Sequence, residues 1–271
     1  MVVFPPCKIN LGLAVVGKRP DGYHDLETGF YPVPFTDVLE AIPAPRFSFT
    51  TTGLPIDGEP ESNLAVKAFR LLEAEIGIPA VKMHLHKIVP MGAGLGGGSS
   101  DGAYALRLMC SLFELELTEA QLSGYALRLG SDCPFFLQDK PMMGKGRGEK
   151  LAAVDVDLSG KHLVVVVLPI HVSTKEAFSG VAPKTPSFDV ADLLGGPISD
   201  WKRALQNDFE TSVFKRHPEI ARCKEQLYDM GALYSSMTGT GSGVYGIFEK
   251  PLPVPITNRF PDATTFSVDL P

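Results

Sequence analysis

The chain has 271 residues, of which 44% are hydrophobic and 21% charged, and its formal net charge is −6. This composition is that of a globular protein rather than a disordered or fibrous one, and the length suffices for two modest domains. The acidic balance argues against a nucleic-acid partner, because a phosphate backbone requires a basic surface. Any anionic ligand must therefore be held by a local cluster of donors.

The cysteines and the hydropathy of the chain bear on its cellular location. Cys7, Cys110, Cys133 and Cys223 are widely spaced and offer neither a disulfide framework nor a zinc site, so we expect a cytoplasmic location. Residues 1–6 lack a basic segment, and we expect no signal peptide. The longest aliphatic run, residues 163–170, is too short for a bilayer and predicts a buried strand; no membrane partner is expected. The sequence leaves the oligomeric state open.

The first thirty residues predict two strands joined by a turn. Apolar residues alternate with others over residues 7–15, which indicates a strand with one buried face. Lys8 and Asn10 are expected together on the opposite, less apolar face. Residues 17–22 have turn chemistry, and a second strand is expected over residues 23–30.

The middle of the chain predicts helices around a glycine-rich loop. Ser62 is the expected N-cap of a helix over residues 64–76. A strand over residues 81–89 precedes the loop, and a helix is expected from about residue 99 to 113. Thr118 and Gln121 predict a capping box for a further helix that ends at Gly130.

The last part of the chain predicts a second domain. Residues 140–150 are rich in glycine and charge, so we expect a boundary after them and domains spanning residues 1–150 and 151–271. Beyond lie a central strand at 163–168, helices near 199–214 and 218–230, and an edge strand near 265–270. A second glycine loop, residues 238–243, separates two further short strands. The elements together predict an α+β protein of two domains.

The loop over residues 90–100 is the strongest functional signal. Five glycines between a strand and a helix allow backbone N–H groups to converge on an anion, and the helix N-terminus adds its positive end. A flexible hinge is the alternative. No Lys-Ser/Thr pair follows, so the loop is not a Walker A motif. The preceding strand carries Lys82, His84 and His86 on one face, which disfavours a dinucleotide fold. We therefore expect a phosphate-binding loop.

Three segments resemble the three motifs of the GHMP kinases: residues 8–13 (Lys-Ile-Asn-Leu-Gly-Leu), 90–100 and 238–243. Their order and spacing match over nearly the whole chain. The resemblance implies the two-domain GHMP kinase fold with the active site in the interdomain cleft. It implies ATP on the N-terminal domain, a C-terminal domain that closes the acceptor site, and phosphoryl transfer with ATP and Mg²⁺.

The opening segment, residues 19–24 and residues 130–136 are similar to one branch of that family. For this branch, the resemblance implies a small-molecule substrate, a cytidine diphosphate-linked methylerythritol. It implies phosphorylation of that substrate's 2-hydroxyl in the non-mevalonate isoprenoid pathway.

The resemblance also implies roles for individual residues. Asp132 is the candidate general base, with a turn-capping role as its alternative, and Lys8 is expected beside it. Ser100 carries a hydroxyl that could face the magnesium ion; the other metal ligands are unknown. The implied substrate-binding residues are Asn10, Tyr23, His24, Phe178 (with a core role as its alternative) and Thr240. The implied ATP-binding residues are Asn63, Pro90, Met91, Gly92, Ala93, Gly94, Leu95, Gly96, Gly97, Gly98, Ser99 and Ser100.

Two other functions remain open at this stage. The chain could be another small-molecule kinase of the same fold with a different acceptor, or a catalytically silent nucleotide sensor. The presence of both Lys8 and Asp132 argues against the sensor, which has no use for a base and its cation.

Overall fold

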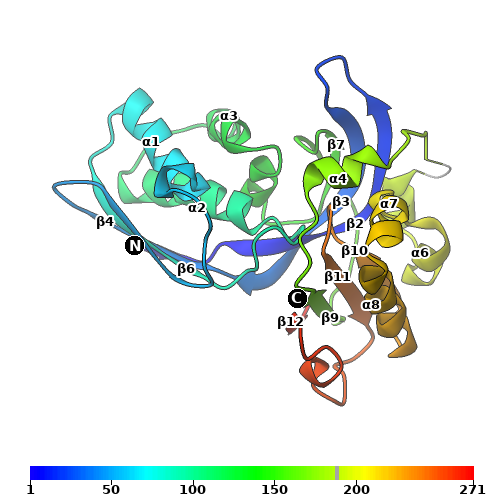
Figure 1. Ribbon diagram of the computed structural model, residues 1–271. Helices are drawn as coiled ribbons and strands as arrows, with labels where there is room; N and C mark the ends of the chain where they lie inside the picture. The colour runs from blue at the N-terminus through cyan, green and yellow to red at the C-terminus, as the bar shows by residue number, and fades with distance from the viewer. Residues whose placement is uncertain (187–188) are drawn as a thin grey trace. The chain divides into compact units, whose positions relative to one another are not determined.

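The computed structural model describes residues 1–186 and 189–271, which form two compact units (Figure 1). The first unit comprises Met1–Cys7, Phe35–Met91 and Gly96–Asp139, and the second comprises Lys8–Pro34, Gly92–Leu95 and Lys140–Pro271. The chain thus passes several times from one unit to the other, and the glycine-rich loop contributes to both. The domain boundary after residue 150 stays a prediction.

The first unit is a four-stranded sheet with three helices. Its strand order is β1 (Val2–Val3), β4 (Val38–Pro43), β6 (Val81–Lys87) and β5 (Ser48–Gly53). Strand β6 runs antiparallel to β4 and parallel to β5. Its side chains alternate between buried and more exposed, as expected for a sheet with one covered face. Helices α1 (Leu64–Ile76) and α3 (Glu119–Leu129) both pack against α2 (Gly97–Leu112).

Local sequence explains the helix ends of this unit. The predicted cap Ser62 was wrong: it ends the short 3₁₀ helix η1 (Pro60–Ser62), and Asn63 caps α1 by accepting a 2.9 Å hydrogen bond from the Ala65 N–H. The capping box of Thr118 and Gln121 is confirmed at the start of α3, which ends at Gly130 as predicted.

The second unit contains two four-stranded sheets. One has the order β2 (Pro6–Lys18), β3 (His24–Thr36), β7 (Met142–Gly146) and β8 (Lys150–Ala153). The other has the order β10 (Tyr234–Met237), β11 (Gly243–Phe248), β9 (His162–Val167) and β12 (Thr264–Asp269). Strand β9 is therefore interior and β12 an edge strand, as predicted. The helices are α4 (Thr174–Ser179), α5 (Val190–Leu194), α6 (Ile198–Ala204), α7 (Phe209–Arg216) and α8 (Pro218–Asp229).

One apolar core joins these elements of the second unit. Leu13 and Val15 of β2 pack in one cluster with Val164 and Val166 of β9 and with apolar residues of α7 and α8. Helix α8 packs on β10 and β11. The core therefore fixes the first strand, which carries Lys8 and Asn10, relative to the sheet that carries the second glycine loop.

Two predictions about this unit were wrong in detail. Strand β2 is buried along both faces instead of the predicted one, and Lys8 and Asn10 are only 3% and 2% exposed. The helix predicted over residues 199–214 is broken into α6 and α7 by residues 205–208, whose backbone pairs with Leu13. Residues 140–150, after which the domain boundary was predicted, form most of the β7–β8 hairpin.

Candidate active site

Lys8 is the centre of a buried polar network in the second unit. Its ammonium donates a 2.9 Å hydrogen bond to the carbonyl oxygen of Gly94 and a second bond to Oδ1 of Asn10. The same nitrogen lies 5.5 Å from the ring centroid of Phe30. A lysine that is 3% exposed requires such partners, because an uncompensated buried charge is costly. The network therefore fixes the position of the ammonium.

Asn10 and two threonines extend this network. Asn10 Nδ2 donates to Thr28 Oγ1 at 3.0 Å, and Thr28 in turn donates to the carbonyl oxygen of Gly12. Thr238 Oγ1 accepts from the Asn10 backbone N–H at 3.1 Å and lies 2.9 Å from the Gly94 carbonyl oxygen, to which it donates. The three motif segments of the sequence thus meet at Lys8 and Asn10. The amide of Asn10 is occupied by this network, and its substrate contact stays a prediction.

The two glycine loops approach each other so closely that only glycine fits. A Cβ atom at Gly94 would lie 2.0 Å from the Thr238 carbonyl oxygen, and one at Gly243 would lie 2.5 Å from the Ala93 carbonyl oxygen. Gly94 also has φ +74°, in the left-handed region that favours glycine. Asn207 holds the second loop from the other side, since its Nδ2 donates to the carbonyls of Met237 and Gly239, both at 2.8 Å.

A buried ionic triad underlies the start of α2 in the first unit. The Lys87 ammonium lies 2.5 Å from Asp37 Oδ2 and 2.7 Å from Asp101 Oδ2, and all three side chains are at most 2% exposed. Asp37 Oδ1 also accepts the N–H groups of Ile88 and Val89. The triad therefore ties the end of β6 to the first turns of α2, where phosphate binding is expected.

Two buried oxygens at this helix start lack hydrogen-bond partners within the described residues: Ser100 Oγ and Asp101 Oδ1. An unpaired buried hydroxyl is costly, and a phosphate oxygen or a metal ion would supply the missing partner of Ser100. Burial raises the pKa of Asp101 from 3.8 to about 7, although the Lys87 ammonium acts in the opposite direction. No cluster of three or more His, Cys, Asp or Glu ligands occurs among the described residues.

Asp132 lies half-buried at the start of the 3₁₀ helix η2 (Cys133–Leu137). It occupies the N-cap position, but its side chain makes no capping hydrogen bond, which weakens the structural alternative. Burial raises the pKa of the neighbouring Cys133 thiol to about 12, so this cysteine stays protonated at neutral pH and is a poor nucleophile. The role of Asp132 as general base stays a prediction.

A pocket of about 700 Å³ in the second unit collects the predicted base-binding residues. Tyr23, His24 and Phe178 all line it. The rings of His24 and Phe178 stack with centroids 4.7 Å apart and planes 24° apart, while Phe178 meets Phe209 edge-on at 4.7 Å. Phe178 therefore packs against the core and also borders the pocket, and its contact with a substrate stays a prediction.

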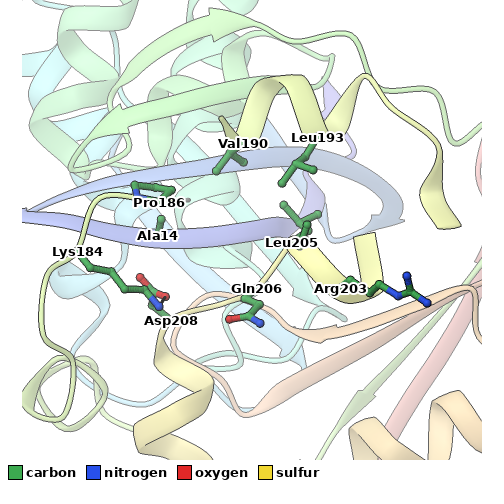
Figure 2. A pocket seen from close by; sticks show the side chains of 10 residues that line it. Ala14, Lys184, Pro186, Val190, Leu193, Arg203, Leu205, Gln206 and Asp208 are labelled. Atoms are coloured by element: carbon green, nitrogen blue, oxygen red, sulfur yellow. Dashed lines mark ion pairs between the residues drawn. The ribbon is translucent and has the colours of Figure 1, made fainter. Parts of the chain in front are cut away.

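A second hollow, of about 170 Å³, lies beside Ala14 and the segment that separates α6 from α7 (Figure 2). Its walls combine apolar and polar residues and include an ion pair of Lys184 with Asp208 at 3.3 Å. None of the predicted site residues lines it. The aromatic pocket is therefore the better candidate for an acceptor site.

The structure divides the predicted residues between the two units. The second unit holds Lys8, Asn10, Tyr23, His24, residues 92–95, Phe178 and Thr240, and the first holds Asn63, Pro90, Met91, residues 96–100 and Asp132. Thr240 is half-buried in the second glycine loop, and Asn63 is engaged as the cap of α1. The adjacency of Lys8 and Asp132 stays a prediction.

The sequence did not reveal the buried residues that hold the site residues in place. Thr28 lies in a strand without any motif, and Asp37 and Lys87 are separated by fifty residues of chain. The one available signal was Lys87 on the apolar face of the alternating strand β6, since a buried lysine demands a carboxylate partner.

Comparison with known proteins is consistent with this arrangement. The model of the GHMP kinases N terminal domain matches residues 63–140, and that of the GHMP kinases C terminal domain matches residues 190–260. The chain belongs to the GHMP kinase family, within its branch of 4-diphosphocytidyl-2-C-methyl-D-erythritol kinases. The mixed α and β fold with N- and C-terminal family domains is thereby confirmed.

Individual relatives cover almost the whole chain. It is 47% identical to the 4-diphosphocytidyl-2-C-methyl-D-erythritol kinase of Parabacteroides distasonis, over 93% of both chains. It is 45% identical to that of Bacteroides thetaiotaomicron, over 95% of this chain and 96% of the relative. A crystal structure of 4-(cytidine 5'-diphospho)-2C-methyl-D-erythritol kinase matches with a TM-score of 0.83, 30% identity and 98% coverage of both chains. Methanococcus jannaschii mevalonate kinase, at 13% identity and TM-score 0.71, shares the fold.

Gly96→Val tests the phosphate-binding loop. Gly96 has φ +71° at the N-terminus of α2, so a β-branched side chain would strain the loop and hinder phosphates from approaching its N–H groups. We expect ATP affinity to fall about tenfold or more, measured by titration with a fluorescent nucleotide. Gly124→Val on α3 is the matched control, because a Cβ there would meet nothing within 4 Å. Equal nucleotide affinity in the two folded variants would show that the loop does not bind phosphate.

Asp101→Asn tests the ionic triad through the pH dependence of stability. Because the folded-state pKa of Asp101 is raised to about 7, its contribution to stability is complete below pH 3.8 and declines as the pH rises to about 7. Urea unfolding should therefore show the variant gaining stability relative to wild type between about pH 4 and 7, and a constant difference above that range. Asp139→Asn, at an exposed carboxylate of the same unit, should leave the profile unchanged. A parallel shift of the Asp101→Asn curve at all pH values would contradict the raised pKa.

Proposed function

We propose that this protein is an ATP-dependent kinase that transfers the γ-phosphoryl group to the 2-hydroxyl of 4-diphosphocytidyl-2-C-methyl-D-erythritol, in the non-mevalonate isoprenoid pathway. The observation that carries the proposal is the meeting of all three motif segments at Lys8, in the unit that also contains the aromatic pocket. Identity of 41–47% to relatives of that name supports the substrate. The proposed domains are residues 1–150, which bind ATP, and 151–271, which close over the acceptor.

ATP binding is proposed to use the glycine loop, residues 90–100. Its N–H groups and the N-terminus of α2 stabilise the negative charge of the phosphates, and Asn63 contacts the adenosine. Ser100, whose hydroxyl lacks a partner among the described residues, would hold Mg²⁺ in part, and the ion would neutralise charge on the transferring phosphoryl group. The triad behind α2 keeps these donors in place.

The acceptor is proposed to bind by its base and its alcohol. Tyr23, His24 and Phe178 hold the cytosine, and stacking on aromatic rings contributes roughly 1–3 kcal/mol per base contact. Asn10 and Thr240 orient the methylerythritol unit. One acceptor molecule thus needs both the aromatic pocket for its base and the polar network for its alcohol, which explains why the two occur in the same unit.

Proton transfer is assigned to Asp132. Its carboxylate accepts the proton of the 2-hydroxyl as the oxygen attacks the γ-phosphorus and the bond to ADP breaks. Lys8, whose ammonium is fixed by Gly94 and Asn10, stabilises the negative charge that develops during transfer. The protein works in the cytoplasm. None of the helices in the described part of the chain has the length and apolar character needed to cross a bilayer.

Acceptor-dependent ADP release tests the proposal. With ATP, magnesium and the cytidyl acceptor, ADP should form only when the acceptor is present. Asp132→Asn should retain ATP binding and lower kcat by ~10²–10⁴, because the variant cannot accept the proton. Asp139→Asn is the control. Near-wild-type kcat in Asp132→Asn would remove the base assignment, and ATP binding without any turnover would favour another acceptor or the nucleotide sensor.

A further inference from the structure

Two lysines line the aromatic pocket. Lys18 ends β2, and Lys175 lies in the first turn of α4. Both line the pocket together with His24 and Phe178, and both are exposed. No aspartate or glutamate is among the ten residues that line the pocket. The aromatic stack is therefore bordered by positive charge from two separate elements.

These positive charges are not neutralised by the protein. Within residues 1–186 and 189–271, neither lysine forms an ion pair. The carboxylates nearest in sequence are engaged elsewhere. Asp21 and Asp25 both pair with Arg19 at 3.0 Å. Glu176, next to Lys175 on α4, pairs with His217 at 2.8 Å.

A further cation strengthens the local field. The Arg147 guanidinium lies 5.0 Å from the ring centroid of Tyr23, which is itself a lining residue. The whole chain has a net charge of −6, so this group of cations is a local positive region on an acidic protein. Unpaired cations beside a flat aromatic stack suit a ligand that joins a base to adjacent phosphates.

The segment before α4 leads from the pocket to the phosphate loop. His171 Nδ1 lies 3.8 Å from the position that a Cβ atom at Gly92 would occupy. The Leu168 carbonyl oxygen accepts a 3.1 Å hydrogen bond from Ser242 of the second glycine loop. Lys175 follows this segment, so it lies along the chain path that connects the base pocket with the proposed site of phosphoryl transfer.

We propose that Lys18 and Lys175 form a cationic clamp for the diphosphate that links cytidine to the alcohol of the acceptor. This inference rests on the proposed function and deepens it. The base enters the aromatic pocket, and the two ammonium groups hold the linker by charge-assisted hydrogen bonds. The clamp makes the charge of the linker a determinant of acceptor specificity.

The experiment compares the binding of CDP and of cytidine by calorimetry in wild type, Lys18→Met, Lys175→Met and the double variant. Each single variant should weaken CDP binding about 3- to 10-fold and cytidine binding less than about twofold, since only CDP carries the linker charge. Lys215→Met, at an exposed lysine of α7 outside the pocket, is the matched control. Added salt should reduce the preference for CDP in wild type and have little effect in the double variant.

The outcomes separate this inference from the proposed function. If wild type phosphorylates the cytidyl acceptor but the double variant keeps the wild-type ratio of CDP to cytidine affinity, the clamp alone is wrong. An equal loss of affinity for CDP and for cytidine would indicate a packing defect and would also contradict the clamp. If wild type neither binds CDP nor turns over the acceptor, the proposed function and the clamp fail together. If the two lysines bind the linker, the KM for the acceptor is higher in the lysine variants than in wild type, and kcat is unchanged.

Discussion

The buried ammonium of Lys8 is the constraint on which the arrangement of the second unit depends. A charge that is 3% exposed is tolerated only where fixed dipoles replace water. Those dipoles come from the Gly94 carbonyl and the Asn10 amide, and the Thr238 hydroxyl, which donates to the Gly94 oxygen, lies 3.3 Å from Asn10 Oδ1. These hydrogen bonds form only when three segments are in place: the first strand, the phosphate loop and the second glycine loop. Such a preorganised cation costs no rearrangement at the moment of reaction.

The glycines of the two loops serve different purposes. Gly94 and Gly243 are required for packing, because a side chain at either would strike the backbone of the facing loop. Gly97 is required for packing in the first unit, where a Cβ would lie 3.0 Å from the Lys87 ammonium. A Cβ atom at Gly92 or Gly98 would meet no atom closer than 3.5 Å. Packing alone therefore requires some glycines of these loops and not others.

Much of the fold could be predicted because the signals were local. The Thr118 capping box, the Gly130 helix end and the apolar run in β9 each depend on a few neighbouring residues. The strands of residues 38–43 and 48–53 were not predicted, because their partner β6 lies about thirty residues or more further along the chain. The break between α6 and α7 arises from pairing with Leu13, which no helical periodicity could indicate.

The motif residues of the candidate site could be predicted from the sequence, but the residues that hold them in place could not. Lys8, His24 and Phe178 were identified, and the structure places the two rings in contact. The burial of Lys8 and Asn10 was missed, since alternation along a strand cannot show that a second layer covers the polar face. The Asp37–Lys87–Asp101 triad was missed for a related reason: its members come from three separate segments.

Single-turnover phosphoryl transfer in Lys8→Met tests the central claim most directly. Enzyme in excess of the cytidyl acceptor is mixed with saturating ATP, and the phosphorylated product is followed by rapid quench. Our account predicts a folded variant with near-wild-type affinity for ATP and CDP and a transfer rate lower by about 100-fold or more, because the preorganised cation is lost. A transfer rate within about twofold of wild type would show that the buried ammonium serves only the packing of the loops.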